Sequence, residues 1–208
     1  MSTVIYEVSG HVATLTLNRP ESLNALNLAM IDDLRTTTAR AAFDPDVRAV
    51  VLRGAGDHFM AGGDLKWFRD QLAMSPQQRQ IRFEEMIAVV HTTILNLKGM
   101  PKPVIAAVHG AVAGFGMSLM MACDLVVAAD NAYFTLAYSN IALSPDGGAT
   151  WSLPRQVGLK QAMEIALLGD TYGAAEAERL GLVNRVVPAA ALDAAVQELA
   201  QRLASGPT

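Results

Sequence analysis

The sequence has little of what builds a disulfide framework, a membrane span or a nucleic-acid surface. Its one cysteine, Cys123, excludes an internal disulfide and favours a reducing compartment. Lysine and arginine total 16 against 20 aspartates and glutamates, and no segment clusters basic residues with aromatics. We therefore expect no nucleic-acid partner. Asp124 interrupts the longest apolar run and the first ten residues lack a signal-peptide pattern, so we expect no membrane partner and a cytoplasmic protein.

Apolar residues are abundant instead, at 51% of 208 residues against 17% charged residues. This length and composition predict one globular domain with a substantial core, or such a domain with a helical appendage. The histidines His58, His91 and His109 lack the spacing of a zinc site, so no metal is expected.

Runs of strand length alternate with helical periodicities along the whole chain, which predicts an α/β fold with crossover connections. The first two strands flank Ser9-Gly10 as a hairpin. Expected strands are Val4–Val8, Val12–Leu17, Val47–Arg53, Val104–Val108, a strand ending at Ala129, Tyr133–Thr135 and Val183–Val187. Expected helices are one ending near Ala42, one from Ser75 to about Lys98, then Phe115–Ala122, Ala149–Val157, Leu159–Leu168, Gly173–Leu180 and Leu192–Ala204.

The pattern also predicts one helix start and the burial of particular apolar side chains. Ser75 followed by Pro and by Gln at the third position predicts a capped helix start. We expect Leu26 to share a helix face with Met30, Leu34 and Ala41, and Trp151 to lie in the core or a pocket wall. The helix after Ser75 is expected to bury its apolar face, Phe83, Ile87, Val90, Ile94 and Leu97.

The segment from Pro103 to Ala129 is the centre of the prediction: a buried strand, a glycine turn, a buried helix and a second buried strand. Gly110, Gly114 and Gly116 allow a tight turn and a close approach of the backbone to a ligand. The first N–H groups of the helix, near Phe115 and Gly116, have no acceptor within the helix and suit a negative oxygen. A second glycine-rich turn covers residues 54–64.

Two other motifs are incomplete. Gly114-Phe115-Gly116 resembles a dinucleotide fingerprint, but Leu119 stands where glycine or alanine is required. Gly116-Met117-Ser118 resembles a hydrolase nucleophile elbow, but Met120 stands where the second glycine belongs. Labelling of Ser118 by a fluorophosphonate would support the hypothesis of a serine hydrolase.

The order of five segments resembles the crotonase superfamily, that is, the enoyl-CoA hydratase/isomerases. The segments are NRPESLNAL (18–26), FMAGGDL (59–65), KPVIAAVHGAVAGFGMSLMMACDLVVAA (102–129), SPDGGATWSLPR (144–155) and GLVNRVVP (181–188). The resemblance implies a ClpP/crotonase-like spiral of ββα turns that acts on acyl-CoA thioesters, with coenzyme A as part of the substrate and no separate cofactor. It also implies a homotrimer or a dimer of trimers.

The resemblance assigns an oxyanion hole to the backbone N–H groups of Gly63 and Phe115. Two such fixed dipoles would hold the thioester oxygen as it becomes an enolate. The family also places CoA or substrate contacts at one set of positions, namely Ala25, Leu26, Ala61, Asp64, Leu65, Ser118 and Tyr138. Asp64 and Asp124 are also expected to cap or brace loops.

The acid–base positions depart from the hydratase pattern of two glutamates, because Ser118 and Tyr138 occupy them. Neither is a good base at its ordinary pKa near neutral pH, so we expect both to line the pocket or donate hydrogen bonds. Asp146 in SPDGG matches the catalytic aspartate of double-bond isomerases and of the ring-opening epoxide isomerases of phenylacetate breakdown, with the latter the nearest in appearance. Taken without the family, Pro145-Asp146-Gly147 is an ordinary turn sequence.

These expectations favour a single-base isomerase and leave three alternatives open: an enoyl-CoA hydratase, an aryl-CoA dehalogenase using Asp146 and His91, and a non-catalytic acyl-CoA binder. We expect a core over residues 1–188. Residues 189–208 are expected to begin a C-terminal helical region that appears incomplete beside the family.

Overall fold

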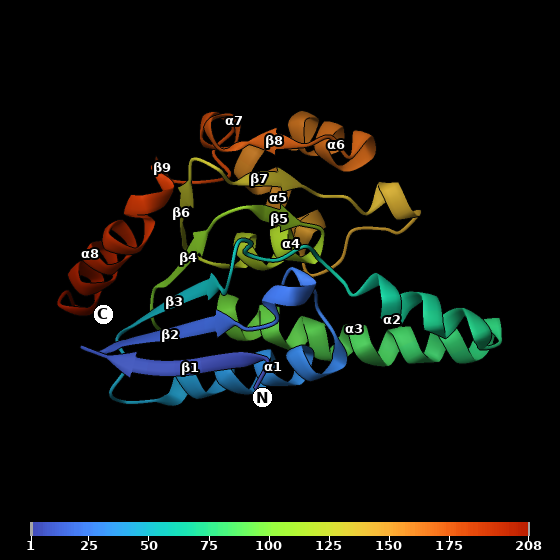
Figure 1. The fold of residues 1–208 in the computed structure, drawn as a ribbon, viewed down its shortest axis with the longest axis horizontal. Helices are drawn as coiled ribbons and strands as arrows, with labels where there is room; N and C mark the ends of the chain where they lie inside the picture. The colour runs from blue at the N-terminus through green and yellow to red at the C-terminus, as the bar shows by residue number, and fades with distance from the viewer. Residues whose placement is uncertain (1, 208) are drawn as a thin grey trace.

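The computed structural model describes residues 2–207, which form two sheets with helices packed around them (Figure 1). The larger sheet has the strand order β1-β2-β3-β4-β6-β9, in which β1 and β2 are antiparallel and the other pairs are parallel. The smaller sheet has the order β5-β7-β8. The strands are β1 Val4–Ser9, β2 Val12–Leu17, β3 Ala49–Gly54, β4 Val104–Val108, β5 Ala111–Ala113, β6 Leu125–Ala129, β7 Tyr133–Thr135, β8 Tyr172–Gly173 and β9 Arg185–Val187.

The helices cover both faces of the larger sheet. α1 and α3 lie side by side on one face, and α8 packs across β3, β4 and β6 on the other (Figure 1). The helices are α1 Leu28–Phe43, α2 Leu65–Asp70, α3 Pro76–Lys98, α4 Phe115–Ala122, α5 Ala149–Val157, α6 Leu159–Leu168, α7 Ala174–Arg179 and α8 Leu192–Ala204.

Alternate residues of the central strands point to opposite faces, and both faces are buried. Leu15 and Leu52, paired across β2 and β3, belong to the core beneath α1 and α3. Val51 and Ile105, paired across β3 and β4, belong to the core beneath α8. This two-sided burial explains why the strands read as continuous apolar runs.

Several predicted elements are confirmed closely. α3 begins at a complete capping box, in which the Ser75 hydroxyl accepts from the Gln78 N–H and the Gln78 side chain accepts from the Ser75 N–H. α4 has the expected bounds, and all eight of its residues are buried.

The start of α1 was predicted wrongly. The helix begins at Leu28, because the Asn27 side chain caps it by accepting from the Met30 N–H. Leu26 instead forms an isolated parallel bridge with Gly63. The sequence reading also missed α2, a short helix that follows the second glycine turn.

Burial differs from prediction at three large side chains. Phe83 and Ile87 on α3 are only half-buried, whereas Val90, Ile94 and Leu97 are buried as expected. Trp151 is 55% exposed and lies against the Arg155 guanidinium, so it is not a core residue.

Among residues 2–207, no helix has the length and apolar character needed to cross a membrane. The division between residues 188 and 189 stays a prediction. In the structure, α8 forms one side of the core rather than a separate body.

Candidate active site

The two glycine-rich turns lie against each other. Met60 and Val112 form a parallel bridge in which the Met60 N–H donates to Ala111 O at 3.0 Å, and the Ala113 N–H donates to Met60 O at 2.9 Å. A Cβ placed on Gly114 would lie 3.5 Å from the Cα of Gly62. The bridge therefore fixes the first turn against the start of α4.

Glycine is required at this junction for two different reasons. Gly62 and Gly114 have φ of +94° and +51°, a region that L side chains rarely adopt. Gly116 has no such φ, but a Cβ there would overlap the backbone oxygen of Met60 and lie 2.9 Å from its Cβ. The close approach of the turns thus depends on the absence of side chains.

Two backbone N–H groups stay available at this junction. Neither the Gly63 N–H nor the Phe115 N–H donates a hydrogen bond to any of residues 2–207. The neighbouring N–H groups are used, since Leu26 donates to Gly62 O and Asp64 donates to Leu26 O. The arrangement can therefore offer two donors to one ligand oxygen, with the N-terminus of α4 adding its positive end.

Both residues line a cavity of about 170 Å³ whose wall is mostly apolar. Asp146 is its single ionisable acid within the described chain, and Tyr138 supplies a hydroxyl. The lining residues are Leu26, Ala61, Gly62, Gly63, Leu65, Phe68, Met86, Val90, Gly114, Phe115, Ala137, Tyr138, Asn140, Ile141, Leu143 and Asp146.

Asp146 is held at both its side chain and its backbone. The Tyr138 hydroxyl donates to Asp146 Oδ1 at 2.5 Å, and Ser118 Oγ donates to the Asp146 carbonyl at 3.0 Å. Ser118 and Tyr138 are 1% and 7% exposed, so both donors are fixed by packing. The expectation that these two residues act as hydrogen-bond donors is met.

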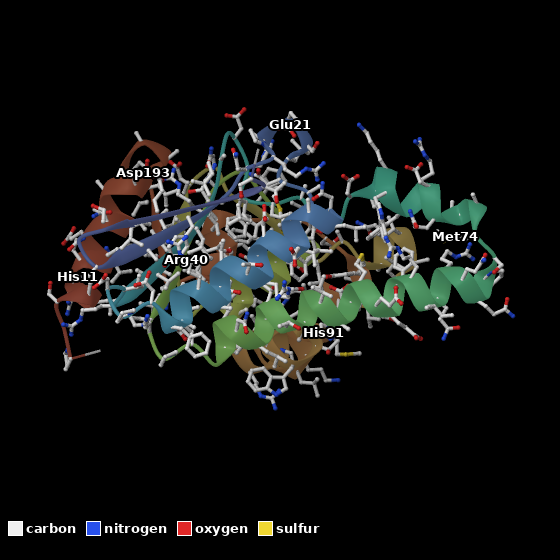
Figure 2. The ribbon with its side chains drawn as sticks, turned by 90° about the horizontal axis from the view of Figure 1, so that it is seen from below. His11, Glu21, Arg40, Met74, His91 and Asp193 are labelled. Carbon is white, nitrogen blue, oxygen red and sulfur yellow. The ribbon has the colours of Figure 1, made fainter. Side chains whose placement is uncertain are left out.

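Burial raises the pKa of Asp146 above the ordinary value for aspartate, while the Tyr138 hydrogen bond and the charge of His91 on α3 act to lower it. His91 lies on the exposed side of that helix (Figure 2). Burial and the Asp146 charge raise the pKa of Tyr138, so its hydroxyl keeps its proton and remains a donor. A desolvated carboxylate with one oxygen engaged by Tyr138 can exchange a proton with a ligand.

The remaining predicted contacts divide into two groups. Leu26, Ala61 and Leu65 line the cavity with Gly63, Phe115, Tyr138 and Asp146. Ala25, Asp64 and Ser118 do not.

The hydrogen bonds and ion pairs of the predicted residues outside the cavity show that they stabilise loops. Asp64 caps α2 through the Lys66 N–H and pairs with Arg19 at 3.2 Å, and Arg19 also donates to Ala25 O. Asp124 accepts from the Val104 N–H at 2.8 Å. Both aspartates brace loops, as expected.

The sequence reading missed two groups of residues at this site. Phe68, from the unpredicted helix α2, and Met86, from α3, line the cavity. A Cβ on Gly147, whose φ is +57°, would lie 2.8 Å from the Phe115 ring. The signal that could have predicted α2 was the apolar group soon after Asp64, which contains a leucine, a tryptophan and a phenylalanine. No sequence signal indicated the contact of Gly147 with Phe115.

Within residues 2–207, no cluster of histidine, cysteine, aspartate or glutamate could hold a metal ion.

Comparisons with known proteins identify the family of this chain. The family described as enoyl-CoA hydratase/isomerase matches residues 7–208. A Rhodobacter capsulatus protein named "Probable enoyl-CoA hydratase" is 40% identical over 99% of this chain and 77% of its own. The 1,2-epoxyphenylacetyl-CoA isomerase of Escherichia coli is 38% identical over 100% of this chain and 78% of its own.

A crystal structure of an enoyl-CoA hydratase from Polaromonas sp. JS666 superimposes with a TM-score of 0.89 at 37% identity, covering 97% of this chain and 77% of that one. The fold is therefore the crotonase fold. The chain belongs to the enoyl-CoA hydratase/isomerase family and is an acyl-CoA enzyme of that family.

Proposed function

We propose that the protein isomerises an unsaturated or ring-epoxide acyl-CoA thioester through an enolate, with Asp146 as its single base. One observation carries the proposal: within residues 2–207, Asp146 is the only acid that lines the cavity between the glycine turns. A 1,3-proton shift needs one group that takes a proton from C2 and returns it to C4. Hydration is easier with a second acid or base to handle the water.

In this mechanism, the thioester oxygen accepts from the N–H groups of Gly63 and Phe115. Asp146 removes the C2 proton, the electron pair moves into the enolate, and the protonated carboxyl returns the proton at C4. The charge on the oxygen is greatest in the enolate, where the two fixed donors act most strongly. The hydrogen bond from Tyr138 to Oδ1 leaves Oδ2 to carry the proton.

The proposal extends to the rest of the substrate. Leu26, Ala61 and Leu65 would contact pantetheine, while Ala25 and Asp64 would shape the loops beside it. We further propose a homotrimer or dimer of trimers, on the family resemblance. We also propose a cytoplasmic location, because the single cysteine, Cys123, cannot form an internal disulfide.

The first test pairs two substrates of equal chain length, a 3-enoyl-CoA and a trans-2-enoyl-CoA. We expect conversion of the first to the 2-enoyl thioester, measured by absorbance, without addition of water to the second. Rapid hydration of the 2-enoyl-CoA would instead make the protein a hydratase. If the protein converts neither enoyl-CoA but does convert a ring-epoxide thioester, its substrate is the epoxide, the second of the two substrate classes proposed.

A second prediction concerns the pH profile. Tyr138→Phe removes the donor to Oδ1, which acts to lower the pKa of Asp146. Since Asp146 must be ionised to act as a base, kcat/KM is lost as pH falls through its pKa. The acidic limb of the variant's profile of kcat/KM against pH should therefore move to higher pH. Ser118→Ala is the matched control, because the Ser118 hydroxyl donates to the Asp146 backbone carbonyl and not to its carboxylate, while its contact with the Tyr138 hydroxyl is longer, at 3.4 Å. Equal displacement of the limb in both variants would contradict the assignment.

A further inference from the structure

A second, larger cavity opens beyond Asp146. It has a volume of about 630 Å³ and lies between α2 and the first half of α3, the two helices that project together at one end of the molecule (Figure 1). Figure 2 shows Met74 in the connection between these helices, at the end of the molecule, whereas His91 on α3 lies toward its middle. The two cavities share lining residues, so they adjoin each other. The shared residues are Leu65, Phe68, Met86, Ile141, Leu143 and Asp146.

The wall of this α2–α3 groove is apolar with a cationic outer part. Phe68 of α2 and Phe83 of α3 both line it, and their rings contact each other with centroids 5.3 Å apart, which holds the two helices together. Arg69 and Arg79 also line it, and Asp146 at the inner end is its only acid among the described residues. An apolar passage between a carboxylate and two guanidinium groups suits a ligand whose far end is negative.

Arg79 is the better placed of the two cations. It is half-buried, while the residues before and after it in the first turns of α3 are exposed. It forms no ion pair with an acid of residues 2–207, and its guanidinium makes one long hydrogen bond of 3.5 Å to Met74 O. Arg69, in contrast, is exposed and lies 3.8 Å from Asp70.

The length of the groove follows from the helix. Met86 contacts both cavities, and Arg79 lies seven residues earlier on α3. At about 1.5 Å per residue, this separates them by roughly 10 Å along the axis. A medium-length acyl chain, or a ring bearing a short arm, spans that distance.

We propose that this groove holds the acyl group and that Arg79 binds a carboxylate at its far end. The substrate class is then the CoA thioesters of medium-length dicarboxylic acids, held at one end by the glycine turns and at the other by Arg79. A guanidinium suits this role because its planar fork matches a carboxylate. The inference rests on the proposed function for the direction in which the thioester lies.

The test measures binding rather than turnover. Calorimetry would compare two saturated thioesters of equal length, octanoyl-CoA and its ω-carboxy counterpart, which cannot undergo the proposed isomerisation. We expect the wild-type protein to bind the ω-carboxy ligand about fivefold more tightly, the scale of a partly exposed charge-assisted contact. Raising the ionic strength should reduce this preference.

Arg79→Met should abolish the preference, with the ω-carboxy ligand then binding no more tightly than octanoyl-CoA, and Arg79→Lys should retain part of it. Arg82→Met is the matched control. Arg82 lies on the same helix but outside the groove, and it pairs with Glu85 at 3.9 Å. It should keep the full preference. All variants should share the wild-type melting temperature, because Arg82 is exposed and Arg79, although half-buried, forms no ion pair with any acid of residues 2–207.

Two outcomes would overturn the inference. Equal binding of both ligands by the wild type would show that no anion site exists in the groove. Equal weakening of both ligands and of free CoA by Arg79→Met would show that Arg79 binds a CoA phosphate instead. Neither result bears on the paired turnover assay. Conversely, a persistent ω-carboxy preference with no isomerisation would leave the site standing and remove the proposed reaction.

Discussion

Asp146→Asn should reduce kcat/KM on the isomerised thioester by about a thousandfold, within the range typical of a positioned general base. The amide has nearly the same shape and its oxygen can still accept from Tyr138, so the geometry should persist. What is lost is the ability to take the proton from C2. Steady-state kinetics on the wild type and the variant, at saturating and low substrate, measure the effect.

Thermal unfolding supplies the control for this variant. The folded protein raises the pKa of Asp146, so the stability linked to its proton is present at low pH and lost as pH rises through that pKa. At neutral pH, the ionised carboxylate therefore opposes folding. Asn carries no charge, so its melting temperature should equal or exceed that of the wild type there, and the difference should close at acidic pH. A well-folded variant with full turnover on every acyl-CoA would eliminate Asp146 as the base.

The parts of the site that local sequence determines were predicted well. α4 follows from an apolar stretch bounded by a glycine turn and a strand, and the helix start at Ser75 follows from its capping residues. Both depend on interactions within a few residues, which a sequence displays directly. The position of Gly63 and Phe115 in adjoining turns required the family resemblance, since their approach depends on the bridge between Met60 and Val112.

The α2–α3 groove was not predictable by the same means. α2 has six residues, too few for a helical periodicity to be evident. Phe83 and Ile87 fit the apolar face of α3 and were expected in the core, yet they are half-buried because this end of the helix extends beyond the sheet (Figure 1). Periodicity identifies the apolar face but not what that face meets.

The contact between Tyr138 and Asp146 depends on an irregular segment. Ala137 and Ala142 adopt φ of +55° and +56°, and Gly147 follows at +57°. These positions turn the chain so that two side chains eight residues apart meet. A positive φ at alanine has no sequence signature, because the surrounding structure imposes it.

Gly116→Ala should have the second largest effect. A Cβ at this position would overlap the carbonyl oxygen of Met60, which is backbone and cannot rotate away, so the first glycine turn must move from the start of α4. Overpacking of this kind costs roughly 1–3 kcal/mol, or a fall of several degrees in melting temperature. Because that movement separates the N–H groups of Gly63 and Phe115, kcat/KM should also fall about a hundredfold, the cost of one lost oxyanion donor.

Gly173→Ala is the matched control for this variant. Apart from its chain neighbours, no heavy atom of residues 2–207 lies within 4 Å of a Cβ at Gly173, and its φ is −77°, which alanine adopts without strain. This substitution should leave both the melting temperature and turnover close to those of the wild type. The assay of Gly116→Ala is made well below its melting temperature, so that unfolding does not contribute. Loss of stability with full turnover in the folded variant would show that the two N–H groups need not be held together, and would remove the oxyanion hole from the mechanism.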